Sequence, residues 1–233
     1  MKVKRKFFKS RSYRLVVNLL KLIPFSHFFK NLSYSQKFED QLILSLVGDK
    51  KGSYIDVGSG LPCFGSNTYL LYRRGWSGIL IDPIPRNIRL AKFFRSRDIS
   101  LNIGVGEKKA ELLFYNLDPY VLSSFDETIA NERLLQGFAK LKYVASIPVL
   151  PLSEILENRV LRDPLVISID TEGFEMQVLK GIDWSSLNPA IICIEEFDNP
   201  INSDTDVKQF LLSHGFKLTF YTGLSSIYTA EKN

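Results

Sequence analysis

Five acidic residues each follow or close a short apolar run of the kind that forms a buried strand. They are Asp56, Asp82, Asp170, Glu172 and Glu195. Carboxylates can remove a proton from a reacting group, accept hydrogen bonds from two neighbouring hydroxyls, or bind a hard cation. Because the ligands of an open α/β sheet bind at the carboxyl ends of its strands, we expect these acids to lie around a ligand site.

A glycine turn follows the first of these acids. The run Tyr54–Val57 leads into Gly58, Ser59 and Gly60, and glycines let the backbone pass close to a ligand where a side chain would collide. A nicotinamide-binding turn has the pattern G-x-G-x-x-G, but its third glycine is replaced here by Cys63. The acid two residues before Gly58 is instead typical of S-adenosylmethionine-dependent methyltransferases, which this stretch resembles. An ordinary strand-to-helix turn is the alternative.

A second strand over residues 76–81 ends at Asp82, and Pro83 and Pro85 follow at the entry to a helix. An acid at this strand tip is placed to accept hydrogen bonds from both hydroxyls of a ribose, and a carboxylate suits a diol better than a neutral side chain does. The third strand ends at Asn102, where the adenine edge of the cofactor would lie. The alternative for Asp82 is a turn or helix-capping residue.

The run Leu165–Ile169 ends in two further acids, Asp170 and Glu172. Either could be the general base that removes a proton from an incoming hydroxyl, or the two could hold a divalent cation that lowers the pKa of that hydroxyl. With no histidine nearby in the sequence, we favour a carboxylate base and predict no firm metal site. The alternative is that Asp170 caps the following helix and Glu172 supports it.

Composition limits the classes of function. The chain has 233 residues, 45% of them hydrophobic, which is enough for one α/β domain with an extension. Two cysteines, Cys63 and Cys193, are too far apart to suggest a zinc site or a disulfide framework, and they favour a reducing cytoplasm. Only two histidines are present, so we expect neither a histidine-rich metal site nor a Ser-His-Asp triad.

The net charge of +5 is unevenly distributed. Residues 1–30 contain nine lysines or arginines and no acid, so the rest of the chain is mildly acidic and is not expected to bind nucleic acid. In this arm Leu15, Val16, Leu19, Leu20 and Ile23 recur at helical spacing. We expect a basic amphipathic arm over residues 1–32, too short to span a bilayer. It either contacts an anionic membrane surface or packs on the domain formed by residues 33–233.

The remaining elements alternate between helix and strand. Residues 33–36 form a possible capping box for a helix that ends at Gly48, with Glu39 and Asp40 as solvated first-turn residues. Strands are predicted near residues 53, 79, 99, 165 and 190, helices over 66–74 and 126–138, and a hairpin from 216–221 and 226–229. This order predicts a doubly wound, mostly parallel α/β sheet with a closing antiparallel hairpin strand. Residues 110–115 and 143–149 are predicted to be extended. The segment from 110 to 149 carries no recognisable chemistry, and we expect it to help select the substrate.

Several motifs together are similar to those of the FkbM family of methyltransferases. They are Ser35-Gln36 with Glu39-Asp40, Tyr54–Gly58, Ser66–Tyr69, Gly75–Gly78, Ile81–Pro83, Asn102–Gly104 and Ser168–Gly173. The similarity covers about residues 33–200, and its most specific part is Ile169–Gly173 with Glu175 and Leu179–Gly181. One departure is the segment Leu61–Phe64, which stands where the commoner family turn has a further glycine. The loop under the methionine end of the cofactor is therefore expected to have a different shape.

The resemblance implies a Rossmann-like class I methyltransferase fold and an O-methyltransferase that uses S-adenosylmethionine. Its acceptor would be a hydroxyl of a sugar, a polysaccharide or a related secondary metabolite. We predict cofactor contacts by Asp56, Gly58, Gly60, Asn67, Asp82, Pro83 and Asn102, catalysis by Asp170 and Glu172, and substrate contacts by Asp40 and Glu195. The alternative is a non-catalytic module on the same fold that binds a membrane surface or a glycan. The expected location is the cytoplasm, peripheral at the inner membrane face if the arm binds lipid, and the oligomeric state is left open.

Overall fold

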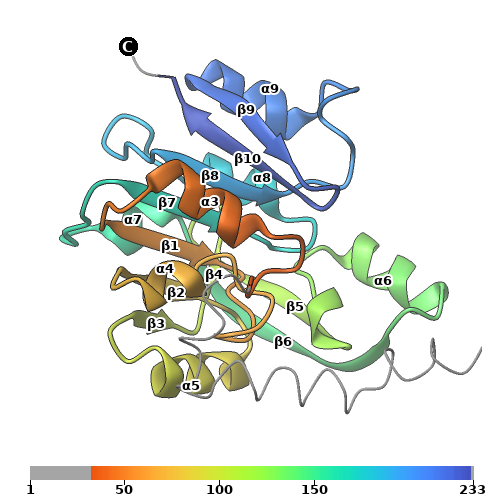
Figure 1. The fold of residues 1–233 in the computed structure, drawn as a ribbon. Coiled ribbons are helices and arrows are strands. Elements are labelled where there is room, and N and C mark those ends of the chain that lie inside the picture. Colours follow the sequence, from red (N-terminus) through yellow and green to blue (C-terminus); the bar gives the residue numbers. More distant parts are fainter. Residues whose placement is uncertain (1–32, 232–233) are drawn as a thin grey trace, which may run out of the picture. The chain divides into compact units, whose positions relative to one another are not determined.

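The structure is a computed structural model, and it describes residues 33–231. From Tyr34 onward the chain forms one compact unit around a seven-stranded sheet, in the order β3-β2-β1-β7-β8-β10-β9 (Figure 1). The strands are β1 (Ser53–Val57), β2 (Ser77–Ile81), β3 (Ile99–Leu101), β7 (Leu165–Ile169), β8 (Ile191–Glu195), β9 (Phe216–Tyr221) and β10 (Ser225–Ala230). Neighbours pair in parallel except around β10, which runs antiparallel to β8 and β9. The predicted doubly wound sheet with a closing antiparallel strand is confirmed.

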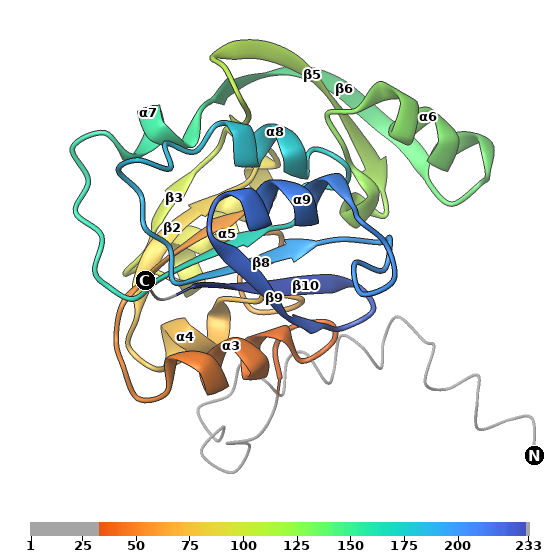
Figure 2. The ribbon, with the colours of Figure 1, turned by 90° about the horizontal axis from the view of Figure 1, so that it is seen from above.

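The central strands are buried on both faces. Every residue of β1 and β7 is buried, as expected for parallel strands covered by helices on both sides. Ile55 and Val57 of β1 join an apolar cluster with residues of α8 (Glu175–Lys180) and α9 (Asp206–Ser213). Alternate residues of a strand face opposite sides, so Asp56 points away from this cluster. On that other face lie α3 (Glu39–Val47) and α4 (Tyr69–Arg73), side by side (Figure 2).

A second, three-stranded sheet interrupts the alternation. It contains β4 (Gly104–Val105), β5 (Ala110–Asp118) and β6 (Lys140–Leu150), in the order β4-β6-β5. The turn η2 (Tyr120–Leu122) and the helix α6 (Glu127–Leu135) lie between β5 and β6, and Asp126 caps α6 by accepting hydrogen bonds from two backbone amides. We call residues 107–148 the insertion. Both of its long strands were predicted as extended segments, but shorter than they are.

The predicted capping box at residues 33–36 is wrong. Helix α3 begins only at Glu39, and its N-cap residue Phe38 has a left-handed backbone and no side-chain cap. The Ser35 hydroxyl instead exchanges hydrogen bonds with Asp40, donating to its carboxylate at 3.0 Å. A short turn therefore precedes the helix and closes onto Asp40.

Glu39 and Asp40 are not solvated, which corrects a second prediction. Their exposed fractions are 1% and 0%. The backbone amide of Tyr34 donates to Asp40 at 2.7 Å, and the Thr222 hydroxyl donates to Glu39 at 3.0 Å. Both carboxylates thus accept hydrogen bonds inside the protein and attach the start of α3 to its surroundings. The helical spacing of apolar residues in the sequence gives no sign of these contacts.

The helix predicted over 66–74 is shorter than expected. α4 begins at Tyr69, because the Ser66 hydroxyl accepts the backbone amides of Thr68 and Tyr69 and holds the preceding residues in a turn. By contrast α5 (Pro85–Phe94) has proline at its first position, as predicted. The short helix α7 (Leu152–Leu156) follows β6.

The predicted amphipathic arm over residues 1–32 lies outside the described residues. Within residues 33–231 the structure contains no helix with the length and apolar character needed to cross a bilayer. Membrane contact through residues 1–30 therefore stays a prediction.

Candidate active site

Three of the predicted acids meet at the carboxyl ends of β7 and β8. Asp170 and Glu172 follow β7, Glu195 is the last residue of β8, and one carboxylate oxygen from each lies within 4.8 Å of the other two. We call these three residues the acid trio. Parallel pairing of β7 and β8 brings their tips together, so a sheet prediction was enough to place the acids on one edge.

Close backbone packing positions Asp170. Its amide donates to the carbonyl of Val57 at 3.0 Å, which ties the loop after β7 to the end of β1. A Cβ atom at Gly58 would lie 1.7 Å from the carbonyl oxygen of Asp170, so this position accepts only glycine without a backbone shift. The glycine turn and the acid trio are therefore adjacent parts of one site.

Two contacts hold Glu172 in an uncommon backbone conformation. Its backbone is left-handed, with φ of 56°, which is uncommon for a residue with a side chain. Its carbonyl accepts a hydrogen bond from the Ser124 hydroxyl at 2.8 Å, and its carboxylate forms an ion pair with Arg133 at 2.6 Å. Both partners come from the insertion, so the insertion fixes the conformation of this predicted catalytic residue.

Burial makes all three members of the trio weak acids. Desolvation, assisted by the neighbouring Glu172 carboxylate, raises the pKa of Asp170 to about 8. Desolvation raises the pKa of Glu172 to about 7, although Arg133 opposes the shift. Glu195 is 7% exposed, and desolvation together with the Asp170 charge raises its pKa to about 11. Near neutral pH the trio therefore retains protons unless a cation replaces them.

Asp170 does not cap the helix after it. The nearby Glu175 carboxylate, in the first turn of α8, binds the preceding loop instead and accepts the backbone amides of Thr171 and Gly173 at 3.0 and 3.1 Å. The N-cap residue of α8, Phe174, has no side-chain cap. The alternative in which Asp170 is a structural cap is thus wrong, and its carboxylate remains directed at the other acids.

Asp82 lies at the tip of β2, as predicted, and is almost fully buried. Its carboxylate accepts hydrogen bonds from the amides of Gly60 at 2.8 Å and Ile84 at 2.7 Å, and from the side chain of Asn87. Desolvation raises its pKa to about 6 despite these donors. Asn102 donates to the carbonyl of Asp82 at 2.9 Å and so steadies the strand tip. Contact of Asp82 or Asn102 with a ribose or adenine stays a prediction, as does contact by Pro83, the next residue along.

The glycine turn has features that fit a nucleoside cofactor. The amides of Gly58 and Ser59 both donate to the carbonyl of Ile81, which fixes the turn beside the tip of β2. Gly60 has φ of 56° and open space around it. The hydroxyl of Ser59 is buried and has no hydrogen-bond partner among the described residues. An unpaired buried hydroxyl beside an open glycine is consistent with a ligand that supplies the missing partner.

Asp56 and Asn67 point into the protein behind this turn. The Thr68 hydroxyl donates to Asp56 at 2.5 Å, and the guanidinium of the fully buried Arg95 lies 3.9 Å from the same carboxylate. Asn67 donates to the Ser168 hydroxyl at 3.2 Å. These contacts support a role in holding the turn on the sheet, and direct contact with a cofactor stays a prediction.

Two residues of the insertion reach the site that sequence reasoning did not identify. Arg133 is one, and Tyr120 is the other. Desolvation raises the pKa of Tyr120 to about 12, and the charges of Asp82 and Asp170 add to the shift, so its hydroxyl lies within electrostatic range of both acids. Neither residue is part of a motif, and only the fold brings them near the strand tips.

The two predicted substrate residues, Asp40 and Glu195, lie in different surroundings. Glu195 belongs to the acid trio, whereas Asp40 is enclosed at the start of α3 by its hydrogen bonds to Tyr34 and Ser35. A substrate contact by either residue stays a prediction, but only Glu195 lies beside Asp170.

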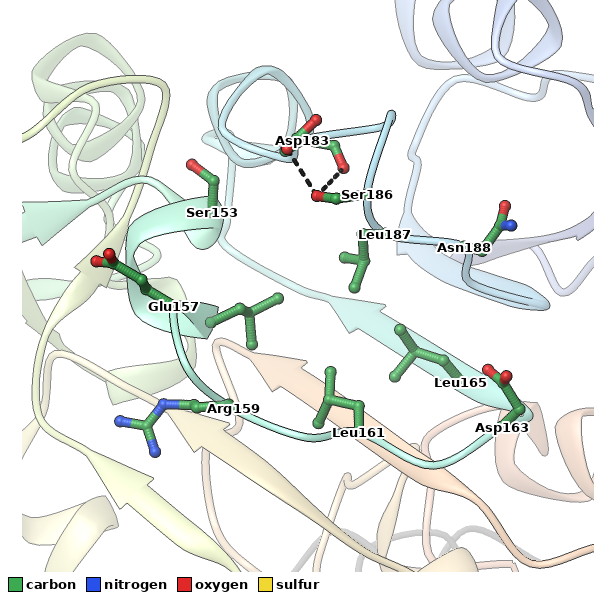
Figure 3. Close-up of a pocket in the computed structure, with 11 residues that line it drawn as sticks. Ser153, Glu157, Arg159, Leu161, Asp163, Leu165, Asp183, Ser186, Leu187 and Asn188 are labelled. Atoms are coloured by element: carbon green, nitrogen blue, oxygen red, sulfur yellow. Dashed lines mark hydrogen bonds between the residues drawn. The ribbon is translucent and has the colours of Figure 1, made fainter.

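A cavity of about 460 Å³ lies elsewhere, at the opposite end of β7 (Figure 3). Leu165, the first residue of β7, lines it together with Arg159 and Asp163, and Asp183 accepts a hydrogen bond from Ser186 at its rim. None of the predicted cofactor or catalytic residues lines this cavity. Ligands of such sheets bind at the carboxyl ends of the strands, so we place the active site at the acid trio.

Comparison with solved structures gives methyltransferases of low sequence identity. A TehB-like SAM-dependent methyltransferase from Corynebacterium glutamicum is 15% identical, with 88% of this chain and 92% of that chain covered and a TM-score of 0.45. A precorrin-6y C5,15-methyltransferase from Geobacter metallireducens is 13% identical, with the same coverage and TM-score. A 1,6-didemethyltoxoflavin-N1-methyltransferase from Burkholderia thailandensis, with S-adenosylhomocysteine bound, is 11% identical, with 82% and 74% covered and a TM-score of 0.42.

Comparison with curated protein sequences gives no match. Comparison with protein families does, since the methyltransferase FkbM domain matches residues 48–218. The match includes the glycine turn, Asp82, the insertion and the whole acid trio, and the doubly wound sheet is the fold of class I methyltransferases. The chain belongs to the FkbM family of methyltransferases.

Proposed function

We propose that this protein transfers a methyl group from S-adenosylmethionine to a hydroxyl of a sugar, a polysaccharide or a related secondary metabolite. The observation that carries the proposal is the acid trio, which lies directly beside the glycine turn at the strand tips. A hydroxyl must lose its proton when it is methylated, and a carboxylate of the trio can accept that proton when it is in its ionised form.

The reaction is a displacement in which the hydroxyl oxygen forms a bond to the methyl carbon while the bond from that carbon to sulfur breaks. The products are a methyl ether and S-adenosylhomocysteine, and the hydroxyl proton passes to the protein. S-adenosylmethionine supplies an activated methyl group on a positively charged sulfur. The protein must therefore hold the acceptor oxygen in line with that methyl group and receive the proton.

Asp170 is the member of the trio best placed to receive the proton. It is joined to the glycine turn through its backbone hydrogen bond to Val57, so a cofactor on the turn would lie beside it. Glu172 is paired with Arg133, whose positive charge lowers the proton affinity of the Glu172 carboxylate and makes it the weaker base. This distinction refines the prediction that either acid acts as base.

The acceptor class rests on the family, and the insertion supports it indirectly. Arg133 and Tyr120 bring polar groups of the insertion to the acid trio and to Asp82. A polar acceptor with several hydroxyls could be oriented by such groups through hydrogen bonds. The insertion would then select the acceptor while the sheet holds the cofactor.

The test is methyl transfer from radiolabelled S-adenosylmethionine to a panel of sugars and glycans, with the product analysed by mass spectrometry. A methyl ether survives mild base, whereas a methyl ester on a carboxylate is hydrolysed, so the treatment identifies the acceptor group. We expect Asp170→Asn to lower turnover by about 10²–10⁴-fold at unchanged cofactor affinity.

Asp198→Asn is the matched control, because Asp198 is an exposed acid outside the trio and its substitution should leave turnover unchanged. Full turnover by Asp170→Asn would reject its role as proton acceptor. A protein that binds S-adenosylmethionine but methylates nothing in the panel, in extracts or on purified glycans, would favour the non-catalytic module.

A further inference from the structure

When its three acids are ionised, the acid trio carries more negative charge than its surroundings compensate. Among the described residues, the cation paired with it is Arg133, which bonds to Glu172 at 2.6 Å. If all three acids were ionised, two negative charges would remain in a largely buried space. Such charge is costly to bury unless a proton or a cation neutralises it.

One oxygen of the trio has no partner. Oε2 of Glu195 is buried and accepts no hydrogen bond from any described residue, while the side chain lies within the trio. The next residue, Glu196, is equally buried, but the hydroxyls of Thr205 and Tyr228 each donate to one of its oxygens. The two neighbouring glutamates therefore differ in one respect: both oxygens of Glu196 are paired, whereas Glu195, whose carboxylate belongs to the trio, has one buried oxygen without a partner among the described residues.

The spacing of the oxygens fits a single ion. Calcium binds oxygen at about 2.3–2.6 Å, so two of its ligands lie at most about 5 Å apart, and magnesium allows about 4 Å. The trio offers one oxygen from each acid within a mutual 4.8 Å. Its ligand atoms are all carboxylate oxygens, which select hard cations over copper or zinc. We propose that Asp170, Glu172 and Glu195 bind one divalent cation of the magnesium, manganese or calcium class.

The surroundings of the trio hold its side chains in place. Arg133 is a positioning residue, because its ion pair and the Ser124 bond to the Glu172 carbonyl hold Glu172 in its left-handed conformation. Glu195 enters from the adjacent strand and closes the site from the other side. Three protein ligands leave positions on an octahedral cation open to water or to an acceptor oxygen.

What the cation does there rests on the proposed function. An acceptor hydroxyl bound to a divalent cation loses its proton more readily than a free one, and the cation also fixes the oxygen beside the methyl group. The site itself does not depend on that reaction, since the argument for it uses only charge, spacing and the unpaired oxygen.

The test uses Mn²⁺ alone, titrated into the 233-residue protein, with free Mn²⁺ measured by electron paramagnetic resonance. We expect one Mn²⁺ per chain, displaced by excess Mg²⁺ or Ca²⁺. Glu195→Gln should weaken Mn²⁺ binding at least about tenfold, since removing a ligand should cost no less than removing a residue that supports one. Glu196→Gln is the matched control and should bind Mn²⁺ as the wild type does.

Circular dichroism confirms that each variant is folded, and Asp170→Asn replaces Glu195→Gln if the latter is not. Absence of stoichiometric Mn²⁺ binding, or equal binding by wild type and the folded ligand variant, would overturn the proposal. Methyl transfer that persists in chelator without Mn²⁺ binding would reject the cation and keep the proposed function. Mn²⁺ binding with no methyl transfer would keep the cation site and reject the proposed function.

Discussion

The Asp82 carboxylate changes its charge close to neutral pH. Burial raises its pKa to about 6 in the protein without ligand, and a ribose would donate hydrogen bonds to the ionised form. The ionised form is lost as the pH falls below 6, so S-adenosylmethionine affinity should fall with it. We expect affinity to be about tenfold weaker at pH 5 than at pH 7, measured by calorimetry at both values.

Two variants control this experiment. Asp82→Asn cannot ionise and should bind weakly with no dependence on pH over this range. Asp82→Ala should lose roughly 1.5–3 kcal/mol of binding free energy at pH 7, the usual value of a hydrogen bond to a charged group. Wild-type affinity in the folded Asp82→Ala protein would show that Asp82 does not contact the cofactor.

Sequence reasoning succeeds for side chains whose role depends on a strand end and fails for those whose role depends on distant contacts. Asp170 and Glu195 are found because each closes an apolar run, and parallel strands bring such ends together. Arg133 and Tyr120 belong to a polar segment without periodicity, so nothing local relates them to the acids. Asp40 looks like an ordinary first-turn acid until the chain before it folds back.

The junction between β1 and β7 depends on one glycine. At Gly58 an added methyl group would overlap the Asp170 carbonyl, at 1.7 Å, and the residue also has φ of 75°. Gly58→Ala should therefore lower the free energy of unfolding by at least about 3 kcal/mol, the sum of a left-handed backbone and overpacking. Urea denaturation of the purified variant measures the loss.

Gly137→Ala is the matched control for Gly58→Ala. Gly137 also has a positive φ, of 72°, but a methyl group there would contact nothing within 4 Å. Only the backbone term remains, so the loss should be about 1–2 kcal/mol. Equal losses of unfolding free energy in the two variants would show that the close contact between Gly58 and Asp170 adds no destabilisation when a methyl group is introduced.

The element boundaries show where local signals are sufficient. The bounds of β7 match the predicted run Leu165–Ile169, and those of β1 differ from the predicted run by one residue, because short, mostly apolar runs are typical of parallel strands buried on both faces. The start of α3 was wrong, since a hydrogen bond from Ser35 to Asp40 outweighs a capping pattern. The extent of β5 and β6 was underestimated, because their partially exposed residues lack a continuous apolar run.

The uneven charge of the 233-residue chain gives a prediction about membrane binding. Residues 1–30 hold nine bases and no acid beside an apolar stripe. Each base near an anionic membrane surface contributes about 1 kcal/mol, so the full chain should sediment with vesicles that contain anionic lipid. Removal of residues 1–30, leaving a chain that starts at Asn31, should abolish this while S-adenosylmethionine binding is unchanged.

Neutral vesicles control for apolar adhesion, and high salt should release the full chain from anionic ones. Equal sedimentation of the full and shortened chains would contradict the prediction. A shortened chain that is insoluble or unfolded would favour the alternative in which the arm packs on the domain.

The insertion leaves and re-enters the fold at neighbouring points, because Gly104 and Val105 pair with Val149 and Leu150. A segment with adjacent ends can be exchanged in evolution, or grafted in the laboratory, without breaking the seven-stranded sheet. In this protein an exchanged segment must also supply a positive charge, since Arg133 of the insertion forms an ion pair with Glu172, which follows β7. A replacement that brings a new acceptor preference without a base at this place would leave Glu172 unpaired. Under the proposed function, acceptor choice and proton transfer would therefore be inherited together.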